Sequence, residues 1–324
     1  ANIFYLSGYG DTDHLLETLG NASVDPQTGQ THFQFASSTA AALFLICYGL
    51  FGRIELDSRA ILTANPDIGF PTYFTRFSNR ALLVREAYHR LSVEMEEPSL
   101  TSDLNLPDHS LAALSNFWMT CTYASVDKRH RIKAALNLAV QRWLGSKGVT
   151  PASDLGTRRR AWTDVPWTAE RGWGDGPGAA AGDSRPTILV ASEQYAHRHV
   201  MYRAYHPLIA QLRSRFRLVA MTVADAIDDV AARDFDEVVY LENGVLDVGR
   251  AFEETARIKP DILFFPSIGM HCWTILLANT RQAPIQIMTP GHPATSRSPF
   301  VDYVLMPEEL VTEESDLSER TVAF

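Results

Sequence analysis

Short apolar runs alternate with amphipathic segments through the second half of the chain. The runs cover residues 187–191, 218–223, 238–241, 262–265, 285–288 and 303–306. Between them, a helical spacing of apolar residues covers 207–216, 226–232, 245–258 and 273–279. Short buried strands that alternate with helices are typical of a parallel, doubly wound sheet. The pattern therefore predicts an α/β domain over residues 186–324.

The first part of the chain has a different periodicity. Apolar residues recur at three- and four-residue spacing over residues 36–51, 81–93, 111–123 and 132–144. Residues typical of helix ends flank these segments, such as Ser110 before Leu111 and Gly145 after Leu144. We therefore expect an all-helical domain over residues 1–148. Residues 149–185 are rich in proline and glycine, which predicts a linker between the two domains.

Composition excludes several classes of protein. A net charge of −9 offers no basic surface of the kind that nucleic-acid binding requires. The longest apolar run, within residues 40–51, is too short to span a bilayer, so we expect no membrane insertion. The three cysteines, Cys47, Cys121 and Cys272, are far apart and form no C-x-x-C pair, which favours a reducing, cytoplasmic compartment.

Three loops follow predicted strands and carry residues suited to chemistry. The first holds Glu193, His197 and His199, and the second, at residues 266–271, holds Gly269. The third, at residues 289–296, holds a histidine, a glycine and hydroxyl groups between two prolines that stiffen it. Ligands of open α/β sheets bind at the carboxyl ends of the strands, so the three loops together predict a site.

Each loop, taken alone, also has a purely structural explanation. Histidines at a loop-helix junction are often surface residues, and a glycine is what a tight strand-to-helix turn needs. The sequence contains no G-x-G-x-x-G after the first strand, no P-loop and no G-x-S-x-G. No set of residues has the spacing of metal ligands, so we expect no metal.

Three segments resemble one family of enzymes. Residues 284–304 contain GHPATS followed by SPFVDYV, residues 192–203 contain SE and HVMYR, and residues 266–270 read PSIGM. These segments resemble the bacterial cytoplasmic N-glycosyltransferases that glucosylate adhesins and, more distantly, the O-GlcNAc transferases. The resemblance implies a helical domain followed by a Rossmann-like domain that forms the N-terminal half of a GT-B glycosyltransferase fold.

The resemblance also implies a reaction. It is the inverting, metal-independent transfer of a hexose from a UDP-sugar, UDP-glucose, to asparagine in Asn-x-Ser/Thr of an adhesin, without a cofactor. His199 and His292 match histidines of the active site. The implied substrate-binding residues are His130, Ser192, Glu193, His197, Ser267, Gly269, Gly291, Pro293, Ala294 and Thr295.

Two departures from the family's pattern affect the expected activity. Arg131 stands where the family has an acidic residue beside the histidine, which affects acceptor handling. The family's second half supplies most contacts to UDP, so we expect a missing C-terminal half or a partner subunit to supply them here. Residues 1–324 alone would then bind UDP weakly and turn over poorly. Two other hypotheses remain open: a non-catalytic polypeptide-binding module, and an O-linked sugar transferase acting on serine or threonine.

Overall fold

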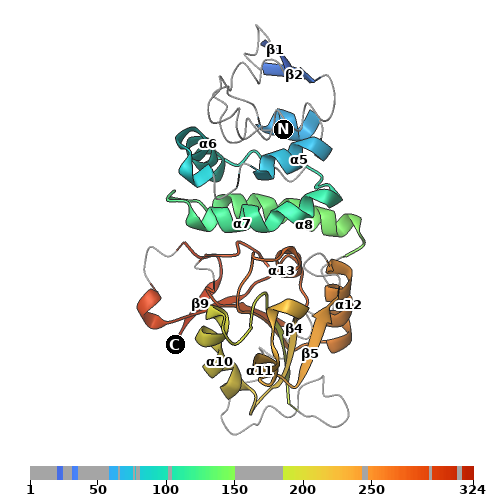
Figure 1. Ribbon diagram of the computed structural model, residues 1–324, viewed down its shortest axis with the longest axis vertical. Coiled ribbons are helices and arrows are strands. Elements are labelled where there is room, and N and C mark those ends of the chain that lie inside the picture. Colours follow the sequence, from blue (N-terminus) through green and yellow to red (C-terminus); the bar gives the residue numbers. More distant parts are fainter. Residues whose placement is uncertain are drawn as a thin grey trace. The chain divides into compact units, whose positions relative to one another are not determined.

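Among the residues that the structure describes, seven strands form one sheet with β3 (Thr187–Ala191) near its middle (Figure 1). The order across the sheet is β5-β4-β3-β6-β7-β8-β9. The other strands are β4 (Arg217–Val223), β5 (Glu237–Leu241), β6 (Ile262–Phe265), β7 (Ile285–Met288), β8 (Tyr303–Met306) and β9 (Arg320–Ala323). Every pairing between these neighbours is parallel. The predicted Rossmann-like sheet is confirmed.

The computed structural model describes most of the second half of the chain and parts of the first. The described residues are 20–24, 31–35, 58–64, 66–75, 77, 81–100, 104–149, 185–242, 247–291, 294–311 and 316–324. The chain divides into two compact units, Ala1–Trp143 and Leu144–Phe324. The predicted helix at residues 36–51 and nearly all of the predicted linker at 149–185 lie outside the described residues.

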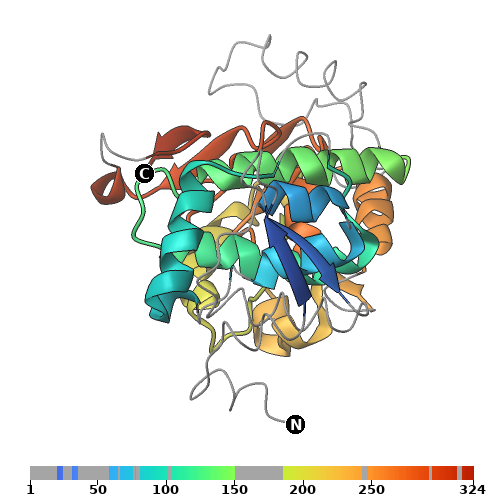
Figure 2. The same cartoon turned by 90° about the horizontal axis from the view of Figure 1, so that it is seen from above.

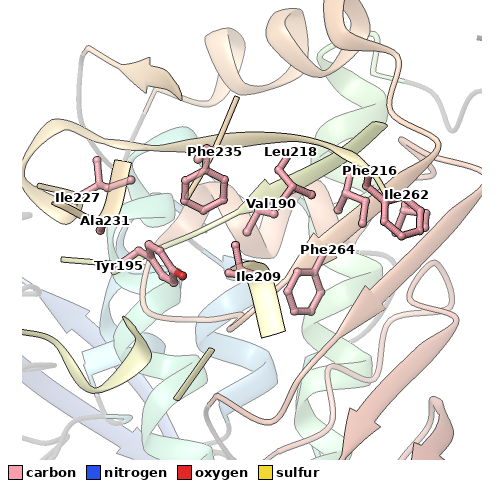
Figure 3. Packing of buried hydrophobic residues seen from close by; sticks show 12 residues of the cluster. Val190, Tyr195, Ile209, Phe216, Leu218, Ile227, Ala231, Phe235, Ile262 and Phe264 are labelled. Atoms are coloured by element: carbon pink, nitrogen blue, oxygen red, sulfur yellow. The ribbon is translucent and has the colours of Figure 1, made fainter. Parts of the chain in front are cut away.

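One face of the sheet packs against helices α10 (Val200–Leu212) and α11 (Asp229–Ala232). Ile188 and Val190 of β3 meet Ile209 of α10 in a buried apolar cluster (Figure 3). Strand residues alternate between the two faces, so Leu189 and Ala191 point to the opposite face. Both are fully buried as well. A strand buried on both faces is what a continuous apolar run indicates.

Helices α12 (Val248–Ile258) and α13 (Cys272–Ala278) contact each other in the same unit (Figure 1). All seven residues of α13 are buried. Both helices fall where the periodicity predicted them. Two short 3-10 helices, η4 (Ala224–Ala226) and η6 (Glu308–Leu310), complete the regular structure of this unit as described.

The predicted helix start at Pro207 is wrong, because α10 begins at Val200 and contains Pro207 in its interior. His199 caps the helix, and Tyr202, Tyr205 and Leu208 of α10 pack against the buried cluster on the sheet. Burial of that apolar face outweighs the backbone hydrogen bond that proline removes. Strand β9 was not predicted at all. Its four residues are exposed, so the segment carries no apolar run.

The first unit contains helices α4 (Ser58–Ala64), α5 (Pro66–Thr75), α6 (Arg85–Glu96), α7 (Leu114–Tyr123) and α8 (Arg131–Ser146), the last crossing the unit boundary. Short 3-10 helices precede α6 and α7, at η1 (Ala81–Leu83) and η2 (Asp108–Ala113). Phe77 and Phe117 pack with ring centroids 4.1 Å apart in its aromatic core. The predicted helices at 81–93, 111–123 and 132–144 are confirmed, with bounds that shift by a few residues.

The first unit is not entirely helical as predicted, because it contains an antiparallel hairpin of β1 (Gly20–Val24) and β2 (Thr31–Phe35) (Figure 2). Phe33 and Phe35 alternate with His32 and Gln34, and such alternation is typical of a strand. The helical spacing of the neighbouring segments obscured this short pattern. Within the described residues, no helix is long and apolar enough to cross a membrane.

Candidate functional site

The strand order reverses between β3 and β6. From β3 the sheet continues to β4 and β5 on one side, and from β6 it continues to β7, β8 and β9 on the other. The loops that leave β3 and β6 therefore diverge at the carboxyl edge of the sheet. Open parallel sheets bind their ligands at such a switch point. All three loops predicted from the sequence follow strands at this edge.

Glu193 joins the first two loops. Its carboxylate accepts hydrogen bonds from the hydroxyl of Ser267 at 2.5 Å, the amide of Gly269 at 2.9 Å and the amide of His271 at 2.8 Å. The hydroxyl of Thr274, on α13, also donates to it at 2.5 Å. Glu193 is fully buried, so four donors from the β6–α13 loop and helix surround one carboxylate. Charge-assisted bonds of this kind are stronger than neutral ones.

This network changes what Ser267 and Gly269 do. The Ser267 hydroxyl and the Gly269 amide, both predicted to meet substrate, already donate to Glu193, and both residues are buried. Gly269 has φ of 121°, a left-handed conformation that favours glycine. Glu193 was itself predicted to bind substrate, but its carboxylate is bonded to the β6–α13 loop. The structure instead supports a positioning role for Glu193, Ser267 and Gly269.

The third loop packs against the second loop and the first turn of α10. Thr289, directly after β7, donates its hydroxyl proton to the carbonyl oxygen of Pro266 at 2.7 Å. Gly291 lies so close to the same carbonyl that an added Cβ would overlap it, and that Cβ would lie 2.6 Å from the terminal carbon of Met201. Met201 stands in the first turn of α10. These contacts and the bonds of Glu193 link the three loops at one edge of the sheet, and their role as a binding site stays a prediction.

The far end of the third loop is held by Glu319, which lies just before β9. Thr295 donates its hydroxyl proton to Glu319 at 2.8 Å, and the amide of Ser296 donates at 2.8 Å. Thr295 is only 1% exposed and its hydroxyl also bonds that of Ser318 at 2.8 Å. Thr295, predicted as a substrate ligand, therefore has its hydroxyl committed to the protein. Ala294 is half-buried at the start of this anchored segment.

The catalytic residue predicted at His292 lies outside the described residues, as does Pro293. In the sequence both stand between Gly291 and Ala294. Their roles stay predictions.

His199 stands at the N-cap of α10, where its Nδ1 accepts a hydrogen bond from the amide of Met201 at 3.3 Å. A ring nitrogen that accepts carries no proton, so the neutral imidazole holds its proton on Nε2. His199 is half-buried. The side chain can therefore present an Nε2–H donor toward a ligand at the switch point while it caps the helix.

His197 is paired with Asp228. Its Nδ1 lies 2.6 Å from Oδ2 of Asp228, and its amide donates to the same oxygen at 2.9 Å. Asp228 is also the N-cap residue of α11, where its side chain accepts a hydrogen bond from the amide of Ala231. The Ala231 amide and then the His197 side chain lower the pKa of Asp228 to about 2. The pair thus fixes the β3–α10 loop to α11.

Two hydroxyls near the switch point have no protein partner among the described residues. The Oγ atoms of Ser192 and Thr222 are buried without a hydrogen bond. Ser192 directly follows β3 and Thr222 lies in β4. Because Ala191 pairs with Met221, the two residues stand side by side at the carboxyl end of β3. An unsatisfied buried hydroxyl costs about 1–3 kcal/mol. This supports the predicted ligand role of Ser192 and adds Thr222, which sequence reasoning missed.

His130 lies in the first unit and is not placed relative to the loops above. It is buried just before α8, and its carbonyl accepts from the amide of Lys133 at 3.1 Å. Lys133 is fully buried with its Nζ 4.8 Å above the ring of Trp118. Arg131, which departs from the family's pattern, is exposed.

Neither a metal centre nor an activated thiol is found in the part of the chain that the structure describes. No group of three or more metal-ligating side chains occurs there. The carboxylate of Asp234 accepts a hydrogen bond from the hydroxyl of Tyr195. The carboxylate of Asp236 accepts one from the amide of Leu218. Burial raises the pKa of the Cys272 thiol to about 12, so this thiol stays neutral and is a poor nucleophile.

No protein-family model matches the chain. Two relatives, each described as a UDP-glucose:protein N-beta-glucosyltransferase, come from Actinobacillus pleuropneumoniae serotypes 5b and 7. Each is 25% identical over 325 residues, covering 98% of this chain. The chain is homologous to these protein glucosyltransferases. It spans about half their length, since the match covers 48% of each relative. The predicted resemblance is confirmed, and the similarity includes both compact units.

A solved structure is also similar. An O-GlcNAc transferase mutant of Thermobaculum terrenum aligns with a TM-score of 0.46 and 16% sequence identity. The alignment covers 89% of this chain and 50% of that one.

Proposed function

We propose that this chain is the acceptor-side portion of a protein N-glycosyltransferase. The reaction is the transfer of a hexose, glucose, from a UDP-sugar to the side-chain amide of asparagine in Asn-x-Ser/Thr, with inversion. The observation that carries this proposal is the homology to protein N-glucosyltransferases over 98% of the chain. The meeting of the three loops at the switch point of the sheet supports it.

In this reaction the amide nitrogen attacks the anomeric carbon as the bond from that carbon to UDP breaks. The diphosphate leaves with the electron pair, and the amide nitrogen loses a proton. Donors that are fixed before the reaction stabilise the charge on the diphosphate. His199 suits this role, because the cap bond to Met201 leaves its Nε2–H free to donate. We propose His292 for the same centre, as the resemblance of its segment implies, and Ser192 for sugar binding.

The site residues thus fall into two groups. We propose that His199, His292, Ser192 and the segment at Ala294 meet the substrates. The substrate-binding role predicted for His130, in the helical unit, stays a prediction. Glu193, Ser267, Gly269, Gly291 and Thr295 instead hold the loops in place, because their polar groups or their packing are committed to the protein. His197 fixes the first loop through Asp228.

Because the match covers about half of each relative, we propose that most UDP contacts come from the equivalent of the relatives' remaining half. Residues 1–324 alone then bind UDP weakly. Isothermal titration calorimetry tests this expectation directly. Micromolar affinity of residues 1–324 for UDP would contradict it.

The reaction itself is tested by mass spectrometry of an Asn-x-Ser peptide incubated with the intact protein and UDP-glucose. We expect the mass of one added hexose, unchanged by a metal chelator, and no addition to a matched peptide with glutamine in place of asparagine. A panel with other UDP-sugars identifies the donor. Hexose on serine instead of asparagine would assign the protein to O-linked transfer. An adhesin acceptor and a cytoplasmic location are part of the same proposal.

A further inference from the structure

The loop that carries His292 is anchored on both sides. On one side Gly291 packs against the carbonyl of Pro266 and the side chain of Met201. On the other side Thr295 and Ser296 bond the carboxylate of Glu319. Only three residues of the chain separate Gly291 from Thr295.

Glu319 is an unusual residue for its surroundings. It is 6% exposed, whereas all four residues of β9, which follows it directly, are exposed. Its carboxylate accepts from the Thr295 hydroxyl, the Ser296 amide and the Ser296 hydroxyl. The burial of a carboxylate in an exposed segment is costly unless donors surround it. The three donors just named come from the third loop. A fourth donor is the amide of Ser318, at 3.2 Å.

The position of Glu319 depends on the pairing of β9 with β8. Arg320 is in register with Tyr303, and its amide donates to the carbonyl of Asp302 at 3.1 Å. The amide of Ser318 adds a bond to the Thr295 hydroxyl at 3.1 Å. Residues 318–320 thus connect the edge of the sheet to the loop by a continuous set of hydrogen bonds.

We propose that Glu319 is a positioning residue of the site, which makes the order of the third loop depend on the docking of β9. This inference rests on the proposed function for its catalytic consequence, and on the hydrogen bonds alone for its structural one. Glu319 acts through Thr295 and Ser296 and does not touch the reacting atoms. A displacement of a reacting group by about 1 Å can lower a rate about a hundredfold.

The experiment compares Glu319→Gln with Glu309→Gln, a matched loss of charge at an exposed residue of η6. Hydrogen exchange followed by mass spectrometry measures protection of the peptide covering residues 291–298, with β3 as an internal reference. We expect faster exchange of that peptide in Glu319→Gln, unchanged exchange of β3, and neither effect in Glu309→Gln. Equal exchange in the two variants overturns the proposal.

Steady-state kinetics on the intact protein supply the second readout. We expect kcat to fall by about tenfold to a hundredfold, because a displaced loop misplaces a group that acts in the reaction step. We expect a smaller change in KM, because Glu319 itself does not bind the substrate. Ser296→Ala removes one donor to the same carboxylate and should reproduce part of the effect even where Glu319 variants fold poorly. Wild-type kcat in both Glu319→Gln and Ser296→Ala overturns the catalytic role. Absence of transfer by the wild-type protein instead counts against the proposed function, and the exchange result then still tests the anchor.

Discussion

Glu193 and Gly269 are joined by a hydrogen bond of 2.9 Å although 76 positions separate them in the sequence. The carboxylate follows β3 and the amide follows β6, the two strands between which the order of the sheet reverses. This bond and its neighbours give the two loops of the switch point one fixed arrangement.

Replacing Glu193 by glutamine should loosen the β6–α13 loop. Glutamine keeps one oxygen for the Gly269 and His271 amides, but its NH2 group replaces the oxygen that accepts from the Ser267 hydroxyl, so this hydroxyl loses its acceptor. We expect the free energy of unfolding to fall by about 1–3 kcal/mol. Chemical denaturation measures this. Glu253→Gln, on the exposed side of α12, is the control and should change stability by less than about 0.5 kcal/mol. Equal stability of the two variants would contradict this positioning role of Glu193.

Gly291→Ala should distort the contact between the third loop and the second. The added methyl group overlaps the carbonyl of Pro266, which is backbone and cannot rotate away. Overpacking of this kind costs about 1–3 kcal/mol. Gly249→Ala is the matched control, because nothing lies within 4 Å of its Cβ position in α12, and it should stabilise by about 0.5–1 kcal/mol. Thermal melts compare the two. A Gly291→Ala protein as stable as the wild type would contradict the described packing.

The two roles of His199 can be separated by substitution. Asparagine is a good N-cap and should keep α10 stable, but it lacks the Nε2–H donor of the ring. We expect His199→Asn to retain wild-type stability and to lower the hexose-transfer rate by about a hundredfold. His199→Ala should lose about 1 kcal/mol of stability in addition. A wild-type rate in His199→Asn would show that the histidine serves only as a cap.

Asp228 should make stability fall in acid. The pKa of Asp228 is lowered to about 2 by the Ala231 amide and then by His197, against an ordinary value of 3.8. The unfolded chain therefore takes up a proton before the folded one does, and stability is lost as pH falls from about 4 toward 2. Asp228→Asn keeps the cap but should make the melting temperature depend less on pH over this range. Asp229→Asn, at the exposed neighbour, should leave the wild-type slope, and an unchanged slope in Asp228→Asn would contradict the assignment.

The sequence predicted the sheet far better than it predicted the bonds within the site. Apolar runs such as Thr187–Ala191 predict buried strands because burial on both faces leaves a local signature. The partners of Glu193 and Thr295 are distant in the sequence, and no local pattern relates a carboxylate to the loop that it holds. Glu319 was hidden for the same reason inside an exposed acidic segment. The prediction that a helix begins at Pro207 was wrong, because packing of the whole of α10 outweighs the local preference of proline for the first turn of a helix.

We propose that His292 and the three loops form one wall of a glycosyl-transfer site. The most direct test measures hexose addition to an Asn-x-Ser peptide by the intact wild-type protein and by His292→Ala, side by side with their melting temperatures. We predict addition of one hexose from UDP-glucose by the wild-type protein, and its loss in His292→Ala at an unchanged melting temperature. Absence of transfer from any UDP-sugar by the wild-type protein, or full activity of His292→Ala, would contradict the account.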